Sequence, residues 1–239
     1  MTTTRVTIAQ ADAAMSLKTW WALLCIYPLA RPLTVFIVNH SRITPNQITF
    51  TAIFLRLVTG FSFFTGTRWG LVLGAFTYFL AYVCDCTDGT VARIKKQSSE
   101  LGRHLDHVAD LICDALILLI LAWTQNVLFT PMVLGMFFMH LAESYISYLS
   151  SFVISFEKEG RSSFFPFILF NSYRRWWFNK NIKSTISFPD YAALVFVFFP
   201  LLGKPLVGLQ IGFYLLLFIV LYTILSTFVS IHTGERYFP

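Results

Sequence analysis

Charged side chains are scarce in this chain of 239 residues, of which only 13% are aspartate, glutamate, lysine or arginine. Soluble domains contain about a quarter of such residues. Hydrophobic residues instead make up 56% of the chain, and phenylalanine alone occupies 26 positions. The scarcity of charge excludes an ordinary soluble domain and indicates an integral membrane protein. Residues 1–18 also lack the short apolar core of a signal peptide, so we expect no cleaved signal.

Cysteine is rare too, and its positions give no sign of a disulfide framework, because they lie in or beside apolar segments. The four cysteines are Cys25, Cys84, Cys86 and Cys113. A zinc site formed by Cys84, Cys86 and the nearby histidines at 104 and 107 is an alternative. We do not favour it, because thiolates prefer soft metals and the neighbouring side chains are hard oxygen ligands.

Long apolar runs predict an all-α, polytopic membrane protein with six transmembrane helices. A spanning helix needs about 20 mostly apolar residues. The predicted spans are 46–66, 70–88, 103–124, 128–155, 188–203 and 208–231. The second span is expected to continue as a helix beyond the membrane. There is no sign of a separate soluble domain, so we interpret 1–239 as a single membrane domain whose six-span bundle covers 46–231.

The segment 18–40 is apolar as well, but it contains Lys18, Pro28, Arg31 and Pro32. We therefore predict an N-terminal amphipathic helix that lies in the membrane interface. A seventh span is the alternative.

Basic residues are distributed unevenly between the predicted loops. Of the 18 lysines and arginines, Arg68 and Lys204 fall in outside loops, Arg56 falls within a span, and the remaining fifteen fall in inside segments. The positive-inside rule therefore predicts that both termini are cytoplasmic. The net charge of +6 is explained by this topology and by contact with anionic membrane lipids, and we expect no nucleic-acid partner.

Four aspartates stand at the cytoplasmic ends of the second and third predicted spans. Asp85 and Asp88 are three residues apart, and Asp106 and Asp110 are four apart, so each pair shares one face of its helix. Such an oxygen-rich pocket suits hard cations such as Mg²⁺ or Mn²⁺. Two such ions beside lipid favour phosphoryl transfer, with one carboxylate as general base. A divalent-cation transporter or a structural ion network is the alternative.

These acids belong to a longer pattern. It reads Asp85-x2-Asp88-Gly89-x2-Ala92-Arg93-x8-Gly102-x3-Asp106-x3-Asp110. This pattern resembles the complete signature of the CDP-alcohol phosphotransferase family. The segment "RITPNQIT" at 42–49 is similar to the one that precedes the first span of that family.

The resemblance implies an enzyme that binds a CDP-linked donor at the cytoplasmic face and releases CMP when an alcohol attacks the β-phosphorus. It implies that Asp85, Asp88 and Asp106 bind metal, with two ions of Mg²⁺ or Mn²⁺, and that Asp110 is both a ligand and the general base. The residues implied to contact or make room for the donor are Gly89, Ala92, Arg93, Gly102, Thr44 and Asn46. For Thr44 and Asn46, a helix cap and turn is an equal alternative.

The acceptor site is predicted in the fourth span, which has no lysine or arginine over 138–151 and offers His140, Glu143 and Tyr145. These groups suit a hydroxylated or cationic acceptor better than a dianion. Helix packing is the alternative for Glu143 and for His140. Asp114, one turn beyond Asp110, either supports the metal ligands or packs against another span.

The basic and aromatic segment 157–185 is interpreted as an interfacial belt that binds anionic lipid, with a phosphate-binding lid over the acceptor as the alternative.

The predicted function is transfer of a phosphatidyl group from CDP-diacylglycerol to a polar alcohol in phospholipid synthesis. The alternative is transfer of a choline or ethanolamine phosphate headgroup from a soluble CDP-alcohol to a lipid hydroxyl. A homodimer is left open.

Overall fold

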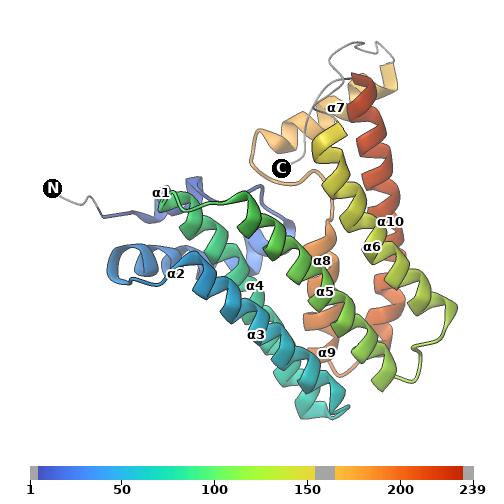
Figure 1. Ribbon diagram of the computed structural model, residues 1–239. Helices are drawn as coiled ribbons and strands as arrows, with labels where there is room; N and C mark the ends of the chain where they lie inside the picture. Colours follow the sequence, from blue (N-terminus) through green and yellow to red (C-terminus); the bar gives the residue numbers. More distant parts are fainter. Residues whose placement is uncertain (1–4, 154–164, 234–239) are drawn as a thin grey trace.

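The computed structural model describes residues 5–153 and 165–233, and regular structure in these parts is helical (Figure 1). The all-α prediction is confirmed. The long helices are α2 (Tyr27–His40), α3 (Pro45–Phe64), α4 (Arg68–Ile94), α5 (Glu100–Thr124), α6 (Pro131–Val153), α7 (Phe165–Phe178) and α10 (Pro205–Thr233). The short ones are α1 (Ile8–Ala13), α8 (Phe188–Ala193) and α9 (Phe199–Leu201), with π-helices η1 (Ala22–Ile26) and η2 (Leu194–Phe198).

The six predicted spans correspond to α3, α4, α5, α6, the continuous segment α8–η2–α9, and α10. Four helices of the described residues are long and apolar enough to cross a membrane, judged by length and composition. They are Ala22–His40, α3, α4 and α10. The protein is therefore a membrane protein with several long apolar helices, whereas the count of six spans and the interfacial position of 18–40 stay predictions.

The helices form two groups that share one apolar core. Helix α3 packs along α4 and α5, and α6 packs along α10. Phe63, Leu118, Met136, Tyr191 and Leu216, from five different helical segments, are fully buried in this core. Gly74 of α4 permits the closest of these contacts, because a Cβ there would come within 2.4 Å of the Phe63 ring.

The N-terminal segment is tied to the same end of the bundle as the four aspartates. Asp12 forms salt bridges with Lys18 at 2.9 Å and with Arg31 at 2.6 Å. Burial raises the pKa of the Asp12 carboxyl, but the two cations outweigh it and hold the pKa below its usual range. Arg93 Nε donates to the Ala14 carbonyl at 2.6 Å, which joins this segment to the end of α4.

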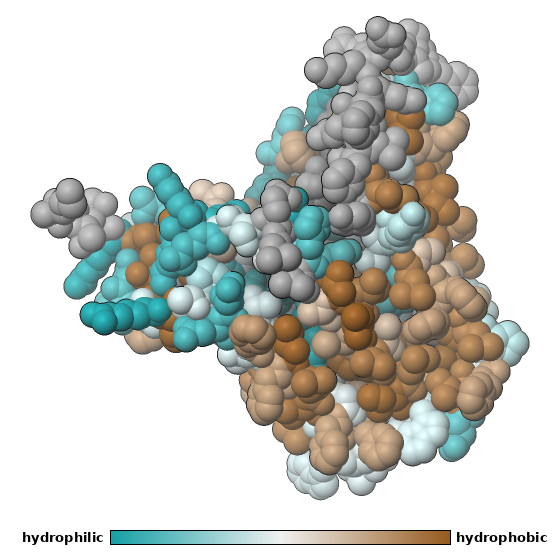
Figure 2. All heavy atoms as spheres, viewed as in Figure 1, coloured by the Kyte–Doolittle hydropathy of each residue, from teal (hydrophilic) through white to brown (hydrophobic). Residues whose placement is uncertain are grey.

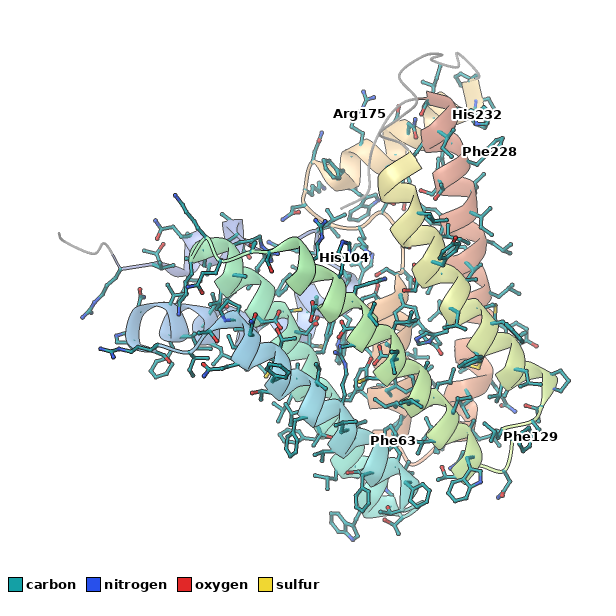
Figure 3. All side chains as sticks on the ribbon, viewed as in Figure 1. Phe63, His104, Phe129, Arg175, Phe228 and His232 are labelled. Carbon is teal, nitrogen blue, oxygen red and sulfur yellow. The ribbon has the colours of Figure 1, made fainter. Side chains whose placement is uncertain are left out.

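The surface of the protein is divided between apolar and polar regions. Figure 2 shows hydrophobic side chains over the lower part of the bundle and hydrophilic ones around α1, α2 and the start of α5. In Figure 3, His104 lies near the start of α5, whereas Phe63 and Phe129 lie toward the opposite end. An apolar outer surface that would be unfavourable in water is what a lipid-embedded bundle requires.

Candidate active site

Three carboxylates from two antiparallel helices meet at the polar end of the bundle. Asp85 lies on α4, and Asp106 and Asp110 lie one turn apart on α5. Each offers an oxygen, and these oxygens all lie within 4.8 Å of one another. The i, i+4 spacing places both α5 side chains on the face toward α4, so the predicted convergence of these acids is what the fold produces.

Asp88, the fourth predicted ligand, is close to this cluster in sequence but is held by another helix. Its Oδ2 accepts a hydrogen bond of 2.6 Å from Thr49 Oγ1 of α3, and the residue is buried. Thr49 is a contact that the sequence analysis did not assign. Thr49 lies within the segment at 42–49 that resembles the family. That resemblance was the sequence feature that could have assigned it to the site.

Arg56 of α3 supplies a cation in the middle of the acids. Its guanidinium pairs with Asp110, and its Nη2 lies 3.9 Å from an Asp85 oxygen. Its Nε lies 3.6 Å from an oxygen of Asp114. Arg56 is only 4% exposed. An unpaired arginine within a span is costly. The position of Arg56 in an apolar run could therefore have predicted acidic partners, but the sequence analysis did not infer them.

Asp114 continues the row of acids along α5. Besides Arg56, it accepts a hydrogen bond of 3.0 Å from the Tyr78 hydroxyl of α4, and it is buried. Asp114 therefore connects α4, α5 and the guanidinium from α3. Both roles expected for it, support for the acid cluster and packing against another span, fit these contacts.

Two hollows border the acids. The smaller, which we call the groove, has a volume of about 110 Å³ and is lined by Asp88 and Asp106. The larger, which we call the inner cavity, has a volume of about 340 Å³ and is lined by Asp110 and Asp114. The oxygens of Asp106 and Asp110 lie within 4.8 Å of each other, so both hollows border the same carboxylate cluster.

Most of the residues predicted to contact the donor line the groove. They are Asn46, Gly89, Ala92, Arg93 and Gly102. Thr44 does not line it. Thr44 caps α3 instead, in a reciprocal pair of hydrogen bonds with Gln47. Groove residues that the sequence analysis missed are Pro45, Thr49, Gln97, Ser98, Ser99 and Arg103.

Gly89 lies beside Arg93 in the groove wall. A Cβ at this position would lie 3.3 Å from Nη1 of Arg93, which is tighter than most real contacts. Arg93 itself bonds to Thr90 Oγ1 and to the Ala14 carbonyl. A glycine at 89 therefore leaves room beside the Arg93 guanidinium, and both residues line the groove.

Of the predicted acceptor residues, His140 and Glu143 line the inner cavity and Tyr145 does not, because it is 64% exposed on the outside of α6. The cavity is also lined by residues that lie far apart in the sequence. Trp21, Tyr78, Tyr82, Lys183 and Phe188 come from four different parts of the chain. The part of the segment 157–185 before residue 165 lies outside the described residues.

The acids fit divalent metal ions. Three carboxylates, those of Asp85, Asp110 and Asp114, lie beside the Arg56 guanidinium, Asp106 joins the cluster of Asp85 and Asp110, and Asp88 is held by Thr49. Within residues 5–153 and 165–233, the salt bridges to these acids all come from Arg56. The remaining negative charge and the hard oxygen donors are what Mg²⁺ or Mn²⁺ requires.

Comparison with known proteins agrees with this geometry. The family model for CDP-alcohol phosphatidyltransferase matches residues 42–231, which is most of the chain. The chain belongs to the CDP-alcohol phosphatidyltransferase family. It is therefore a transferase of substituted phosphate groups in phospholipid synthesis, and the cation-transporter alternative is set aside.

The fold of this family member is also found among solved structures. The crystal structure of Mycobacterium tuberculosis phosphatidylinositol phosphate synthase with CDP-DAG bound matches it with a TM-score of 0.54 and 19% sequence identity. The match covers 87% of this chain and 94% of that one. No curated protein matches the chain at a significant level.

The Arg56 contacts predict that stability depends on metal. In Arg56→Gln, the acids lose their buried cation, which costs about 3–5 kcal/mol when no metal replaces it. We expect a large fall in Tm in chelator and a much smaller fall in Mg²⁺, measured by tryptophan fluorescence during heating in detergent.

Arg68→Gln is the matched control. Arg68 donates to the carbonyls of Pro200 and Leu201, away from the acids. Its loss should lower Tm equally with and without Mg²⁺. Equal falls for Arg56→Gln in the two conditions would show that Arg56 does not compensate the metal ligands.

Proposed function

We propose that the protein transfers a phosphatidyl group from CDP-diacylglycerol to the hydroxyl of a polar alcohol and releases CMP. The observation that carries this proposal is one carboxylate cluster that borders two hollows, with Asp106 lining the groove and Asp110 lining the inner cavity. Transfer requires donor and acceptor to meet at one phosphorus, and this arrangement provides a separate space for each.

The groove is the proposed binding place of the CDP portion of the donor. Small residues at 89, 92 and 102 leave its wall open, and Arg93 and Arg103 border it with positive charge. Guanidinium groups suit phosphate oxygens because they donate several hydrogen bonds in one plane. Asn46 supplies an amide that can bond to the nucleotide.

The inner cavity is the proposed place of the acceptor, whose hydroxyl would lie beside Asp110. The hydroxyl oxygen forms a bond to the β-phosphorus, and its proton passes to the Asp110 carboxylate. The bond between the β-phosphorus and the oxygen that bridges it to the α-phosphorus breaks, and that oxygen leaves with CMP. Arg56 orients Asp110 toward the cavity through its ion pair.

Asp85, Asp106 and Asp110, with Asp88 on the groove side, would hold Mg²⁺ or Mn²⁺. When bound, such ions neutralise the diphosphate and stabilise the leaving group. Two ions per site and a homodimer stay predictions.

The first test is release of CMP by the purified protein. We expect release with CDP-diacylglycerol, Mg²⁺ and a polar alcohol, and none in excess chelator or in Asp85→Asn and Asp88→Asn. Release that requires CDP-choline together with diacylglycerol would reverse the roles of donor and acceptor. Turnover that persists in chelator would contradict the role of the acids.

The second test separates chemistry from binding at Asp110. Asparagine keeps the shape of the side chain but cannot take the hydroxyl proton, and loss of a general base costs roughly a hundredfold to ten-thousandfold in rate. We expect Asp110→Asn to bind CDP-diacylglycerol nearly normally in saturating Mg²⁺, measured by calorimetry, while turnover collapses. Asp85→Asn should lose donor affinity instead. Equal losses of affinity and rate in Asp110→Asn would make Asp110 a metal ligand alone.

We also propose that the site faces the cytoplasm and that both termini are cytoplasmic. Support comes from the uneven distribution of the 18 basic residues between the two ends of the bundle. With all four cysteines removed, single cysteines at positions 97 and 180 should react with an impermeant reagent from the cytoplasmic side, and those at 68 and 126 from outside. Labelling of 97 and 180 from opposite sides would refute this topology.

A further inference from the structure

Glu143 of α6 is an acid without a basic partner in the described residues, although it lines the inner cavity. Its one recorded hydrogen bond is from Ser147 Oγ, one turn along the same helix, at 2.9 Å. Lys183 borders the same cavity, but the two form no salt bridge there. A carboxylate at membrane depth is normally paired, so Glu143 has the properties of a binding site for a cationic ligand.

Aromatic side chains also line the cavity that Glu143 borders. Trp21, Tyr78, Tyr82 and Phe188 line the same cavity. The backbone of Trp21 is held in place by its amide, which donates a hydrogen bond to Asp190 Oδ1 at 2.6 Å. Aromatic faces attract ammonium groups, most strongly where water is excluded. An acid and several rings around one cavity favour a positively charged nitrogen.

His140 shows which face of α6 is turned toward the cavity, because it belongs to the cavity wall. It lies one turn before Glu143 on α6 and is 0% exposed, yet neither ring nitrogen has a hydrogen-bond partner. Its ring meets Phe188 edge-on at 4.5 Å, which fixes its orientation. Buried polar groups without partners are costly and rare.

The charges around the cavity disfavour a phosphorylated acceptor. Among the described lining residues, the lysine and arginine side chains are Arg56 and Lys183. Arg56 already pairs with three aspartates. A phosphate dianion would have Lys183 as its remaining strong cation and would lie near Asp114 and Glu143, whose like charge would repel it.

We propose that the acceptor is a small alcohol that carries a cationic nitrogen, an amino alcohol, with its nitrogen at Glu143 and the aromatic rings and its hydroxyl beside Asp110. This inference rests on the function proposed above. The volume of about 340 Å³ is at the low end for ligand cavities, which suits a molecule of this size.

The test compares three classes of acceptor at saturating CDP-diacylglycerol and Mg²⁺, with CMP release as the readout. The first class consists of alcohols with a cationic nitrogen, called amines here for brevity: ethanolamine, choline and L-serine. The neutral polyols are glycerol and inositol, and the anions are glycerol phosphate and inositol phosphate. We expect an amine to be the preferred acceptor. Preference for a polyol or a phosphorylated alcohol would overturn the inference and leave the proposed function standing.

Variants of Glu143 test the site of the nitrogen. Glu143→Gln should raise the KM for the amine at least tenfold without changing the KM for CDP-diacylglycerol, and Glu143→Asp should recover part of the loss. Leu141→Met, at an exposed position on the same helix, is the control and should change neither. An unchanged KM for the amine in Glu143→Gln would also overturn the inference.

A binding measurement that needs no turnover distinguishes the proposed function from the proposed cationic site. The amine should raise the Tm of the wild-type protein in the presence of Mg²⁺ and CMP, and should not raise that of Glu143→Gln. If no acceptor releases CMP but this shift is observed, the proposed function fails and the cationic site stands. If neither turnover nor a shift is observed, both fail.

Discussion

The ion pairs of Arg56 bring together the parts of the protein on which the site depends. A guanidinium at 4% exposure contacts acids from two other helices, Asp85 on α4 and Asp110 and Asp114 on α5. In a low-dielectric bundle, neither the cation nor the acids could be left unpaired without a cost of several kcal/mol. The packing of α3 against α4 and α5 therefore fixes the direction in which the carboxylates point.

Close packing also joins α3 and α4 at a distance from the charges. Gly74 and Phe63 interlock at the far end of α3 and α4, and Thr59 and Thr77 share a hydrogen bond of 2.8 Å between the same helices. Small and polar contacts of this kind bring helices close in lipid, where the hydrophobic effect gives no preference for helix–helix over helix–lipid contact. The acids can then be concentrated at one end without disturbing the rest of the bundle.

Much of the fold was predictable from the sequence, because spans are long and apolar and the aspartate spacing follows the helical period. The groove was predictable in part for the same reason, since its glycine, alanine and arginine residues lie on the faces that carry the acids. Arg56 and Trp21 were not assigned to the site, and Lys183 was placed near it only through the alternative interpretation of 157–185 as a lid over the acceptor. They are separated from it by tens of residues, and only the packing of α3, the N-terminal segment and the α7–α8 connection brings them to the inner cavity.

The exposed side of α6 shows how far periodicity can mislead when the partner of a helix is unknown. Glu143 and Tyr145 looked equivalent in sequence, but residues two apart on a helix point in different directions. Burial of His140 fixes which face of α6 is turned inward, and Glu143, one turn away, shares that face while Tyr145 is turned outward. The cavity consequently receives one acid from α6 without a hydroxyl from Tyr145 beside it.

The polar surface of the inner cavity is therefore strongly asymmetric, with the paired acids of α5 on one helix and the unpaired carboxylate of α6 on the next. An acceptor with a hydroxyl at one end and a positive charge at the other matches that asymmetry, whereas a neutral polyol would leave the charge of Glu143 uncompensated.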